Sequence, residues 1–148
     1  MTSNYLLFRL GERLFGVRMQ GAVEILPWKK SRRVPSSLSY VEGIMDYRGE
    51  LYPVFQLAQL LGIPQPGPIG FTASEQAPVR GRSIILLREG SRSFGITVDL
   101  VVKMARLEDS VEQPAEIKGI NPQLLAGVRM DEDQEVILIH FERLFNAG

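Results

Sequence analysis

The chain has 148 residues, and its 17 Lys and Arg balance its 17 Asp and Glu, so its formal net charge is zero. A chain of this length forms one domain, or two small ones that share a core, and needs no disulfide or metal to fold. The absence of cysteine excludes disulfide frameworks, thiolate zinc sites and cysteine nucleophiles, and it fits a reducing compartment. The neutral charge is also unlike that of most nucleic-acid binders, which carry a basic surplus or a basic face.

The sequence predicts no targeting or membrane segment. Its first residues lack the basic region followed by an apolar run that marks a secretory signal peptide. No stretch approaches the roughly 18 consecutive apolar residues of a membrane-spanning helix. We therefore expect a cytoplasmic protein without direct membrane insertion.

The first part of the chain is predicted to be a row of short strands joined by turns. Apolar alternation bounded by glycine and proline indicates strands at 5–10, 14–19, 22–26, 44–47 and 51–55. Arg48 and Gly49 form the expected turn of the last hairpin, because glycine supplies the positive φ that such turns often require. A short helix is expected at 56–61, and Gly62 would end it.

A segment rich in proline and glycine, residues 63–81, interrupts any regular structure and marks the expected boundary within the chain. The second part begins again with predicted strands at 84–87, 94–98, 101–107, 127–130 and 135–140. A short helix is expected at 142–145. We expect one domain made of two subdomains, about 5–62 and 82–146, arranged either in tandem or interleaved.

The two parts of the chain repeat one sequence pattern. Residues 6–16 align with 85–95 at an offset of 79, and the second hairpin of each part aligns at an offset of 84. An ordered repeat of this kind indicates two similar structural units. With many short strands and few helices, it predicts a mainly β fold of paired small barrels. The copies differ most at Tyr47-Arg48-Gly49-Glu50, which makes that turn a candidate for a special task.

An enzymatic function has little support in the residues. The single histidine, His140, lies in a strand-like apolar run, where a structural role is simpler than catalysis or metal binding. Asp131-Glu132-Asp133 lacks the spaced ligands of a calcium loop and is interpreted as a hairpin turn. No phosphate loop, nucleophile elbow or zincin motif is present. We expect no catalytic residues, no cofactor and no metal.

Four motifs in order resemble the CheW family of chemotaxis adaptors. The first is the hairpin at 6–17 followed by Val23-Glu24-Ile25, and the second spans 34–54 around the Arg-Gly turn. The third is Phe94-Gly95-Ile96-Thr97-Val98-Asp99, and the fourth spans 125–139. Each motif alone is weak evidence for the family, but all four in order and with the right spacing are strong evidence. The resemblance covers nearly the whole chain, from about residue 5 to 145.

The resemblance implies two five-stranded SH3-like barrels, with a short helix after the second hairpin of each unit. It implies a non-enzymatic scaffold that couples chemoreceptors to a CheA-type histidine kinase in a signalling array at the membrane. The receptor's cytoplasmic hairpin tip would bind in a groove between the subdomains, and the kinase's regulatory domain would bind at the barrel ends. By position in the family pattern, the receptor-binding candidates are Ala22, Ile25, Leu26, Val98, Val101 and Val102. The simpler interpretation is that these residues fill the core between the barrels, because alternation along a strand buries some side chains and exposes others.

The turn at Tyr47, Arg48 and Gly49 is the second candidate contact. A long cation at a hairpin turn can pack back onto the barrel, or it can bind a partner carboxylate with two hydrogen bonds. The family pattern commonly has Asn-Leu before Arg-Gly, where this chain has Asp46-Tyr47, and Val where it has Ala22. These departures leave an adaptor of a divergent pathway, such as pili or surface motility, as an alternative. The basic cluster at 29–33 leaves a nucleic-acid-binding barrel as a weaker one, since a solvated loop explains it as well.

Overall fold

The computed structural model describes residues 2–32, 40–62, 82–108 and 125–139, and these form a mainly β structure. A 3-10 turn, η1 (Met19–Gly21), and one short helix, α1 (Leu57–Leu61), are the helical elements of this part of the chain. The strands are β1 (Thr2–Leu10), β2 (Arg13–Arg18), β3 (Ala22–Pro27), β4 (Val41–Tyr47), β5 (Glu50–Gln56), β6 (Ser83–Glu89), β7 (Arg92–Val98), β8 (Leu100–Glu108), β9 (Leu125–Asp131) and β10 (Gln134–Ile139).

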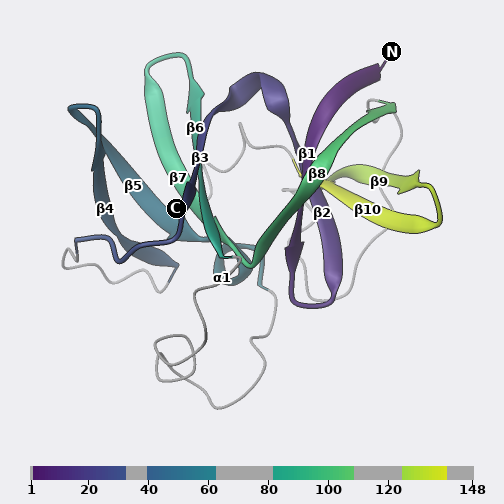
Figure 1. Ribbon diagram of the computed structural model, residues 1–148, viewed down its shortest axis with the longest axis horizontal. Coiled ribbons are helices and arrows are strands. Elements are labelled where there is room, and N and C mark those ends of the chain that lie inside the picture. Colours follow the sequence, from purple (N-terminus) through teal and green to yellow (C-terminus); the bar gives the residue numbers. More distant parts are fainter. Residues whose placement is uncertain (1, 33–39, 63–81, 109–124, 140–148) are drawn as a thin grey trace.

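The strands form two five-stranded sheets that lie side by side (Figure 1). The terminal sheet has the order β8-β1-β2-β10-β9, and the central sheet has the order β3-β6-β7-β5-β4. β2 pairs with β10 and β5 pairs with β7 in parallel, whereas all other neighbours are antiparallel. The predicted mainly β fold with two five-stranded units is confirmed.

Each sheet combines strands from both parts of the sequence repeat. The terminal sheet joins the first hairpin, β1–β2, to β8, β9 and β10, and the central sheet joins β3–β5 to β6–β7. The strand order therefore does not follow the two halves of the sequence. The division into subdomains at about 5–62 and 82–146 stays a prediction.

The predicted elements occur where the sequence placed them, with modest differences at their ends. Most strands are one to three residues longer than expected, since their pairing continues into the polar residues next to the turns. α1 ends at Gly62, whose φ of 85° is the left-handed conformation that glycine adopts without strain. The turn η1 was not predicted. The second expected helix, at 142–145, and His140 lie outside the described residues.

The main core lies between the two sheets. Leu6, Phe8 and Phe15 from the terminal sheet pack with residues such as Ile85 and Ile96 of the central sheet, and α1 contributes its leucines to the same cluster. Side chains alternate along a strand, so the residues in between point the other way and fill a smaller core within each sheet. β1 and β6 are therefore buried on both faces, which explains their nearly continuous apolar runs.

Side-chain contacts join the two edge strands of each sheet. In the terminal sheet, Lys103 Nζ of β8 lies 2.7 Å from Asp131 Oδ2 of β9, and Arg129 of β9 donates a hydrogen bond to the Glu108 carbonyl of β8. In the central sheet, the Trp28 indole, just after β3, donates to Glu42 of β4 at 3.1 Å. Both sheets are thus curled so that their edges approach each other, as in small barrels.

The segment after β3 also pairs directly with β4. The backbone groups of Arg32 and Ile44 exchange two hydrogen bonds, of 2.9 and 2.8 Å. Gly43 lies beneath this crossing, where a Cβ atom would come within 2.5 Å of the Arg32 carbonyl oxygen and of Ser31 Oγ. Glycine is required here because the obstructing atoms include backbone that cannot rotate away.

We predict that Gly43→Ala lowers the free energy of unfolding by about 1–3 kcal/mol, the usual cost of overpacking a fixed contact. Urea denaturation followed by circular dichroism measures this change. Gly95→Ala is the matched comparison, because its Cβ would meet the Ile84 Cγ2 methyl at 3.1 Å rather than a backbone carbonyl. A loss at Gly43 no larger than that at Gly95 would contradict the proposed clash.

Glu42 is the centre of a partly buried hydrogen-bond network at this edge. Its carboxylate accepts hydrogen bonds from Trp28 Nε1, from Gln56 Nε2 at 3.0 Å and from Thr97 Oγ1 at 3.2 Å. Burial raises the pKa of the Glu42 carboxyl above its usual value of 4.5, although the bond from Trp28 acts in the opposite direction. The folded protein therefore holds this proton more tightly than the unfolded chain does.

This raised pKa predicts a pH-dependent contribution to stability. As pH rises from 4.5 through the higher pKa of the folded state, the unfolded chain ionises first, so the contribution of Glu42 is lost. Glu42→Gln cannot titrate and supplies the reference. The difference in free energy of unfolding, wild type minus variant, should be larger at about pH 4 than at about pH 8. A difference that grows with pH would contradict the direction of the shift.

Candidate functional site

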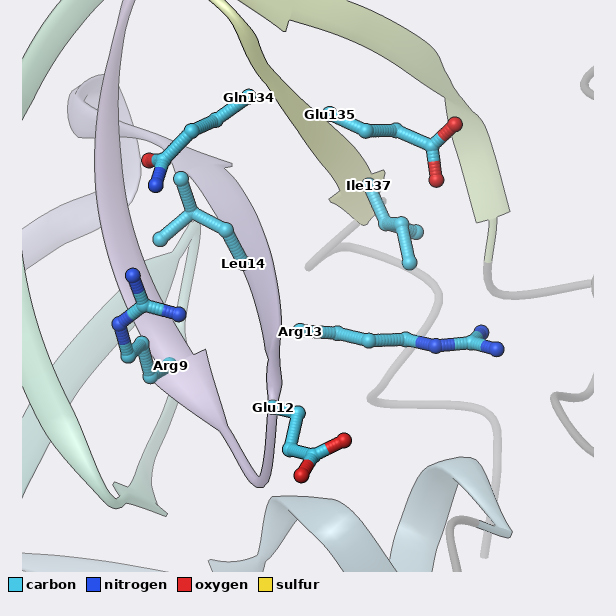
Figure 2. Close-up of a pocket in the computed structure, with 7 residues that line it drawn as sticks. All are labelled: Arg9, Glu12, Arg13, Leu14, Gln134, Glu135 and Ile137. Carbon is cyan, nitrogen blue, oxygen red and sulfur yellow. The ribbon is translucent and has the colours of Figure 1, made fainter.

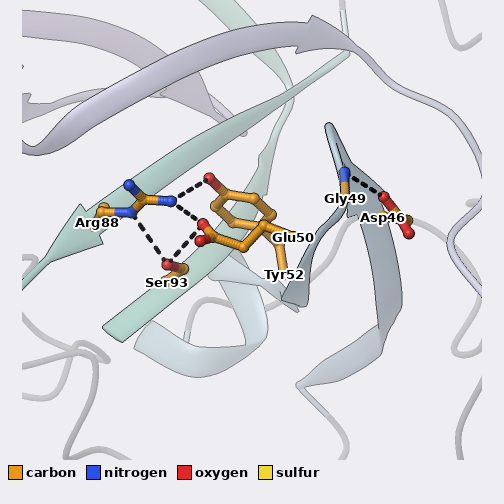
Figure 3. Close-up of polar contacts among 6 residues, drawn as sticks. All are labelled: Asp46, Gly49, Glu50, Tyr52, Arg88 and Ser93. Carbon is orange, nitrogen blue, oxygen red and sulfur yellow. Dashed lines mark hydrogen bonds and ion pairs between the residues drawn. The ribbon is translucent and has the colours of Figure 1, made fainter. Parts of the chain in front are cut away.

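The turn between β4 and β5 holds its tip residue in an unusual backbone conformation. Arg48 has a φ of 53° and Gly49 a φ of 82°, so both residues of the two-residue turn are left-handed, as tight hairpins require. The Asp46 side chain accepts a hydrogen bond of 3.0 Å from the Gly49 amide and secures the turn (Figure 3). Arginine lacks the freedom of glycine in this region of φ, so the backbone at Arg48 is strained relative to a glycine in the same place.

The Arg48 side chain is exposed and lies over its neighbour's ring. Its Cζ is 5.3 Å from the centroid of Tyr47, a cation–π contact. Tyr47 is in turn fixed by a 3.2 Å hydrogen bond from its hydroxyl to Glu24 of β3, and by an edge contact with Tyr52. Within the described residues no carboxylate forms an ion pair with Arg48. The guanidinium can therefore still donate hydrogen bonds to a carboxylate from outside the protein.

A polar cluster fixes the base of the same hairpin to the neighbouring strands (Figure 3). Arg88 of β6 forms an ion pair with Glu50, the residue that follows Gly49. Ser93 of β7 donates a 3.2 Å hydrogen bond to the same carboxylate, and the Arg88 guanidinium lies 3.5 Å from the Tyr52 hydroxyl. The hydrogen bond from Arg88 lowers the pKa of Glu50, so this carboxylate is ionised at neutral pH.

Sequence reasoning missed this cluster. Glu50 belongs to the divergent turn, and Arg88 aligns with Arg9 at the 79-residue offset of the repeat. Nothing in the spacing shows that residues 38 positions apart meet across β7. Only the strand order of the central sheet brings them together.

The six groove candidates differ in exposure. Ile25 and Val102 are exposed, at 38% and 40%, whereas Val98 is 1% exposed and belongs to the core between the sheets. Ala22 and Val101 are half-buried against that core, and Leu26 is half-buried against the core of the central sheet. The structure thus leaves Ile25 and Val102 most accessible to a partner, and the role of all six stays a prediction.

Ile25 and Val102 belong to two rows of exposed apolar side chains on the edge strands. The β3 row is Val23 and Ile25, and the β8 row is Leu100, Val102 and Met104. Val23 and Ile25 correspond to Val102 and Met104 at the 79-residue offset of the repeat. We call these five residues the apolar rows. Sequence reasoning missed Val23, Leu100 and Met104, although their alternation along the strands could have indicated them.

The described part of the chain contains no group of three or more His, Asp or Glu placed to hold a metal ion. In the same part, no helix is both long and apolar enough to cross a membrane. The expectations of no catalytic residues and no cofactor stay predictions. The turn and the apolar rows stay candidate binding features.

Comparison with known proteins gives consistent results. The family model of the CheW-like domain matches residues 4–148. The chemotaxis protein CheW of Treponema pallidum is 28% identical over 142 residues, which cover 95% of this chain and 80% of that protein. The probable chemotaxis protein CheW of Rhizobium etli is also 28% identical, over 94% of this chain and 84% of that protein.

A solved structure shows the same fold. The crystal structure of the scaffolding protein TtCheW from Thermoanaerobacter tengcongensis superposes with a TM-score of 0.80, at 24% sequence identity. The match covers 98% of this chain and 88% of that one. Since the family model matches almost all of the sequence, this chain belongs to the CheW-like domain family.

Proposed function

We propose that this protein is a non-enzymatic scaffold that couples chemoreceptors to a CheA-type histidine kinase. The observation that carries the proposal is the match to the CheW-like family over residues 4–148. Relatives that cover most of the chain at 28% identity are named chemotaxis proteins CheW. The divergent-pathway and nucleic-acid alternatives are not favoured by these comparisons. The proposed location is the cytoplasm, at membrane receptor arrays.

The apolar rows are the proposed docking surface for the receptor. A receptor's cytoplasmic hairpin is helical, and a helix binds through apolar side chains at positions i, i+3, i+4 and i+7. Val102 and Ile25 project from edge strands and are exposed, so a helix can cover them without disturbing the core. Val98, Ala22, Leu26 and Val101 would support this surface from below.

The Arg48 turn is the proposed contact for the kinase's regulatory domain. Its guanidinium is exposed, has no ion-pair partner among the described residues and stands on the ring of Tyr47. A carboxylate of the partner could bind it with two charge-assisted hydrogen bonds. The Arg88–Glu50 ion pair would hold the hairpin in place for this contact.

The proposed mechanism is geometric. The apolar rows lie on β3 and β8, and the Arg48 turn lies at the tip of the β4–β5 hairpin, linked to β3 by the hydrogen bond from Tyr47 to Glu24. We propose that each place binds one partner. Holding both on one rigid scaffold raises the effective concentration of each toward the other. Control of the kinase would then depend on where the scaffold places it relative to the receptor.

Co-purification tests this proposal. Immobilised protein should retain both a receptor cytoplasmic hairpin and a kinase regulatory domain. Val102→Glu should reduce retention of the hairpin only, because a buried charge at a helix contact is costly. Retention of neither partner by the wild-type protein would refute the coupling function.

A second prediction separates binding from stability at the turn. Asparagine tolerates the left-handed conformation better than arginine, so Arg48→Asn should raise the free energy of unfolding by roughly 0.5–1 kcal/mol. The same change removes the cation and should weaken binding of the kinase domain about tenfold, the effect of losing a charge-assisted bond. Urea denaturation and calorimetric titration measure the two effects.

Glu132→Asn is the matched control. Glu132 occupies the equivalent turn of the terminal sheet, with a φ of 56°, so this change should bring a similar gain in stability. It should leave binding at the Arg48 turn unchanged. If Arg48→Asn destabilises the protein, Arg48 has a structural role and the contact is wrongly assigned.

A further inference from the structure

A pocket of about 270 Å³ opens at the end of the terminal sheet, beside the β1–β2 turn and the start of β10 (Figure 2). Leu14 and Ile137 form its buried part, at 4% and 1% exposure. Figure 2 shows the Arg9 guanidinium and the Gln134 amide on the same side of the pocket, one on either side of Leu14. Arginine, amide and apolar wall together suggest a site for a small polar group.

The repeat places this pocket at the position of the Arg88–Glu50 cluster in the other sheet. Arg9 corresponds to Arg88 at the offset of 79, and Gln134 corresponds to Glu50 at the offset of 84. The strand register supports this correspondence, because Arg9 faces Leu14 across β1–β2 and Arg88 faces Ser93 across β6–β7. The two sites are therefore the same place in two copies of one fold.

Alternation along the strands puts both arginines at the end of a small core. Tyr5 and Leu7 share a side of β1 with Arg9 and belong to the core within the terminal sheet. Ile84 and Leu86 share a side of β6 with Arg88 and belong to the core within the central sheet. Each arginine thus lies at one end of a curled sheet; Arg9 is half-buried, whereas the Arg88 side chain is 45% exposed.

The two copies differ in how this cation is balanced. Glu50 neutralises Arg88, and Ser93 and Tyr52 add hydroxyl groups. In the terminal sheet the acid is replaced by neutral Gln134, and the side chain of Arg9 forms no ion pair within the described residues. The central sheet therefore supplies its own carboxylate, while the terminal sheet leaves the corresponding place open.

Other charged groups at the pocket do not take over this role. Glu12, Arg13 and Glu135 also line it, and all three are exposed, as is Gln134. Exposed charges are screened by water and ions, and this screening also applies to the Arg88 and Glu50 side chains, at 45% and 42% exposure. Arg9 is half-buried beside an apolar wall, where a charge-assisted bond to a carboxylate is stronger.

We propose that this pocket binds a carboxylate from a glutamate or aspartate side chain of a partner protein, with Arg9 and the Gln134 amide as donors. The bound carboxylate takes the place that Glu50 occupies in the central sheet. The site is separate from the Arg48 turn and from the apolar rows. It rests on the proposed scaffold function only for the source of the carboxylate.

A partner-free titration tests the pocket directly. The full chain, labelled with 15N, is titrated with acetyl-glutamate amide, with acetyl-glutamine amide as the neutral matched probe and with inorganic phosphate. We expect saturable shifts of the Arg9 Nε and Gln134 side-chain signals with the glutamate probe alone. No saturable shift, or equal shifts with the neutral probe, would overturn the proposal. Stronger binding of phosphate would also overturn it in favour of a phosphate site.

Internal filling of the pocket supplies the second test. Gln134→Glu places a carboxylate opposite Arg9, so it should raise the melting temperature and weaken the glutamate probe about tenfold. Arg9→Gln should weaken binding of the glutamate probe by about the same factor without raising the melting temperature. In the double variant, Gln134→Glu should no longer raise the melting temperature, because Arg9 is absent. Conversely, Glu50→Gln should create a second carboxylate site at Arg88. A melting temperature that Gln134→Glu does not raise, or raises equally without Arg9, would contradict the pairing.

The experiments distinguish a failure of the pocket proposal from a failure of the proposed scaffold function. Absence of probe binding with intact retention of receptor and kinase would refute the pocket alone. Probe binding without retention of either partner would refute the scaffold function and leave the pocket in place.

Discussion

The parallel pairing of β5 with β7 and of β10 with β2 is the contact on which the other features depend. It joins the second hairpin of each half of the sequence repeat to the first hairpin of the other half. Val54 faces Gly95 in one pair, and Leu138 faces Gly16 in the other. A Cβ at Gly16 would lie 3.0 Å from Leu7, so a residue without a side chain lets the strands around it pack this closely. The same glycine occurs in both copies because both make the same approach.

This pairing determines where the polar residues can meet. It brings the base of the β4–β5 hairpin against β7, so that Glu50 reaches both Ser93 and Arg88. In the terminal sheet the same register brings the start of β10 against Leu14, and Gln134 comes to the side of Arg9. Both sheets share this strand arrangement, but Glu50, Ser93 and Tyr52 of the central cluster are replaced by Gln134, Leu14 and Val136 in the terminal sheet, which removes the carboxylate and both hydroxyl groups. Each copy thus serves as a comparison for the other.

The sequence predicted the strands well because alternation and glycine turns are local signals. It also predicted the Arg48-Gly49 turn, whose positive φ at both residues follows from the short loop. It could not predict that strands are exchanged between halves, because alternation shows which face is buried and not which strand lies alongside. For the same reason the sequence predicted both Val98 and Val102 as groove residues and did not distinguish the buried one from the exposed one. Val98 lies on β7, which has neighbours on both sides, whereas Val102 lies on an edge strand.

The edge strands also bear on the kind of partner that we propose for the apolar rows. An open edge with unpaired backbone groups invites a further strand. Here the edges of β8 and β9 are joined by Lys103 and Asp131, and the segment after β3 pairs with β4 through Arg32 and Ile44. An ion pair thus bridges the edges of β8 and β9 and one backbone bridge covers part of the β4 edge, while the apolar rows of β3 and β8 stay exposed. The features that these strands present outward in the apolar rows are apolar side chains, and a helix binds such side chains through its own apolar face, as in the proposed receptor contact.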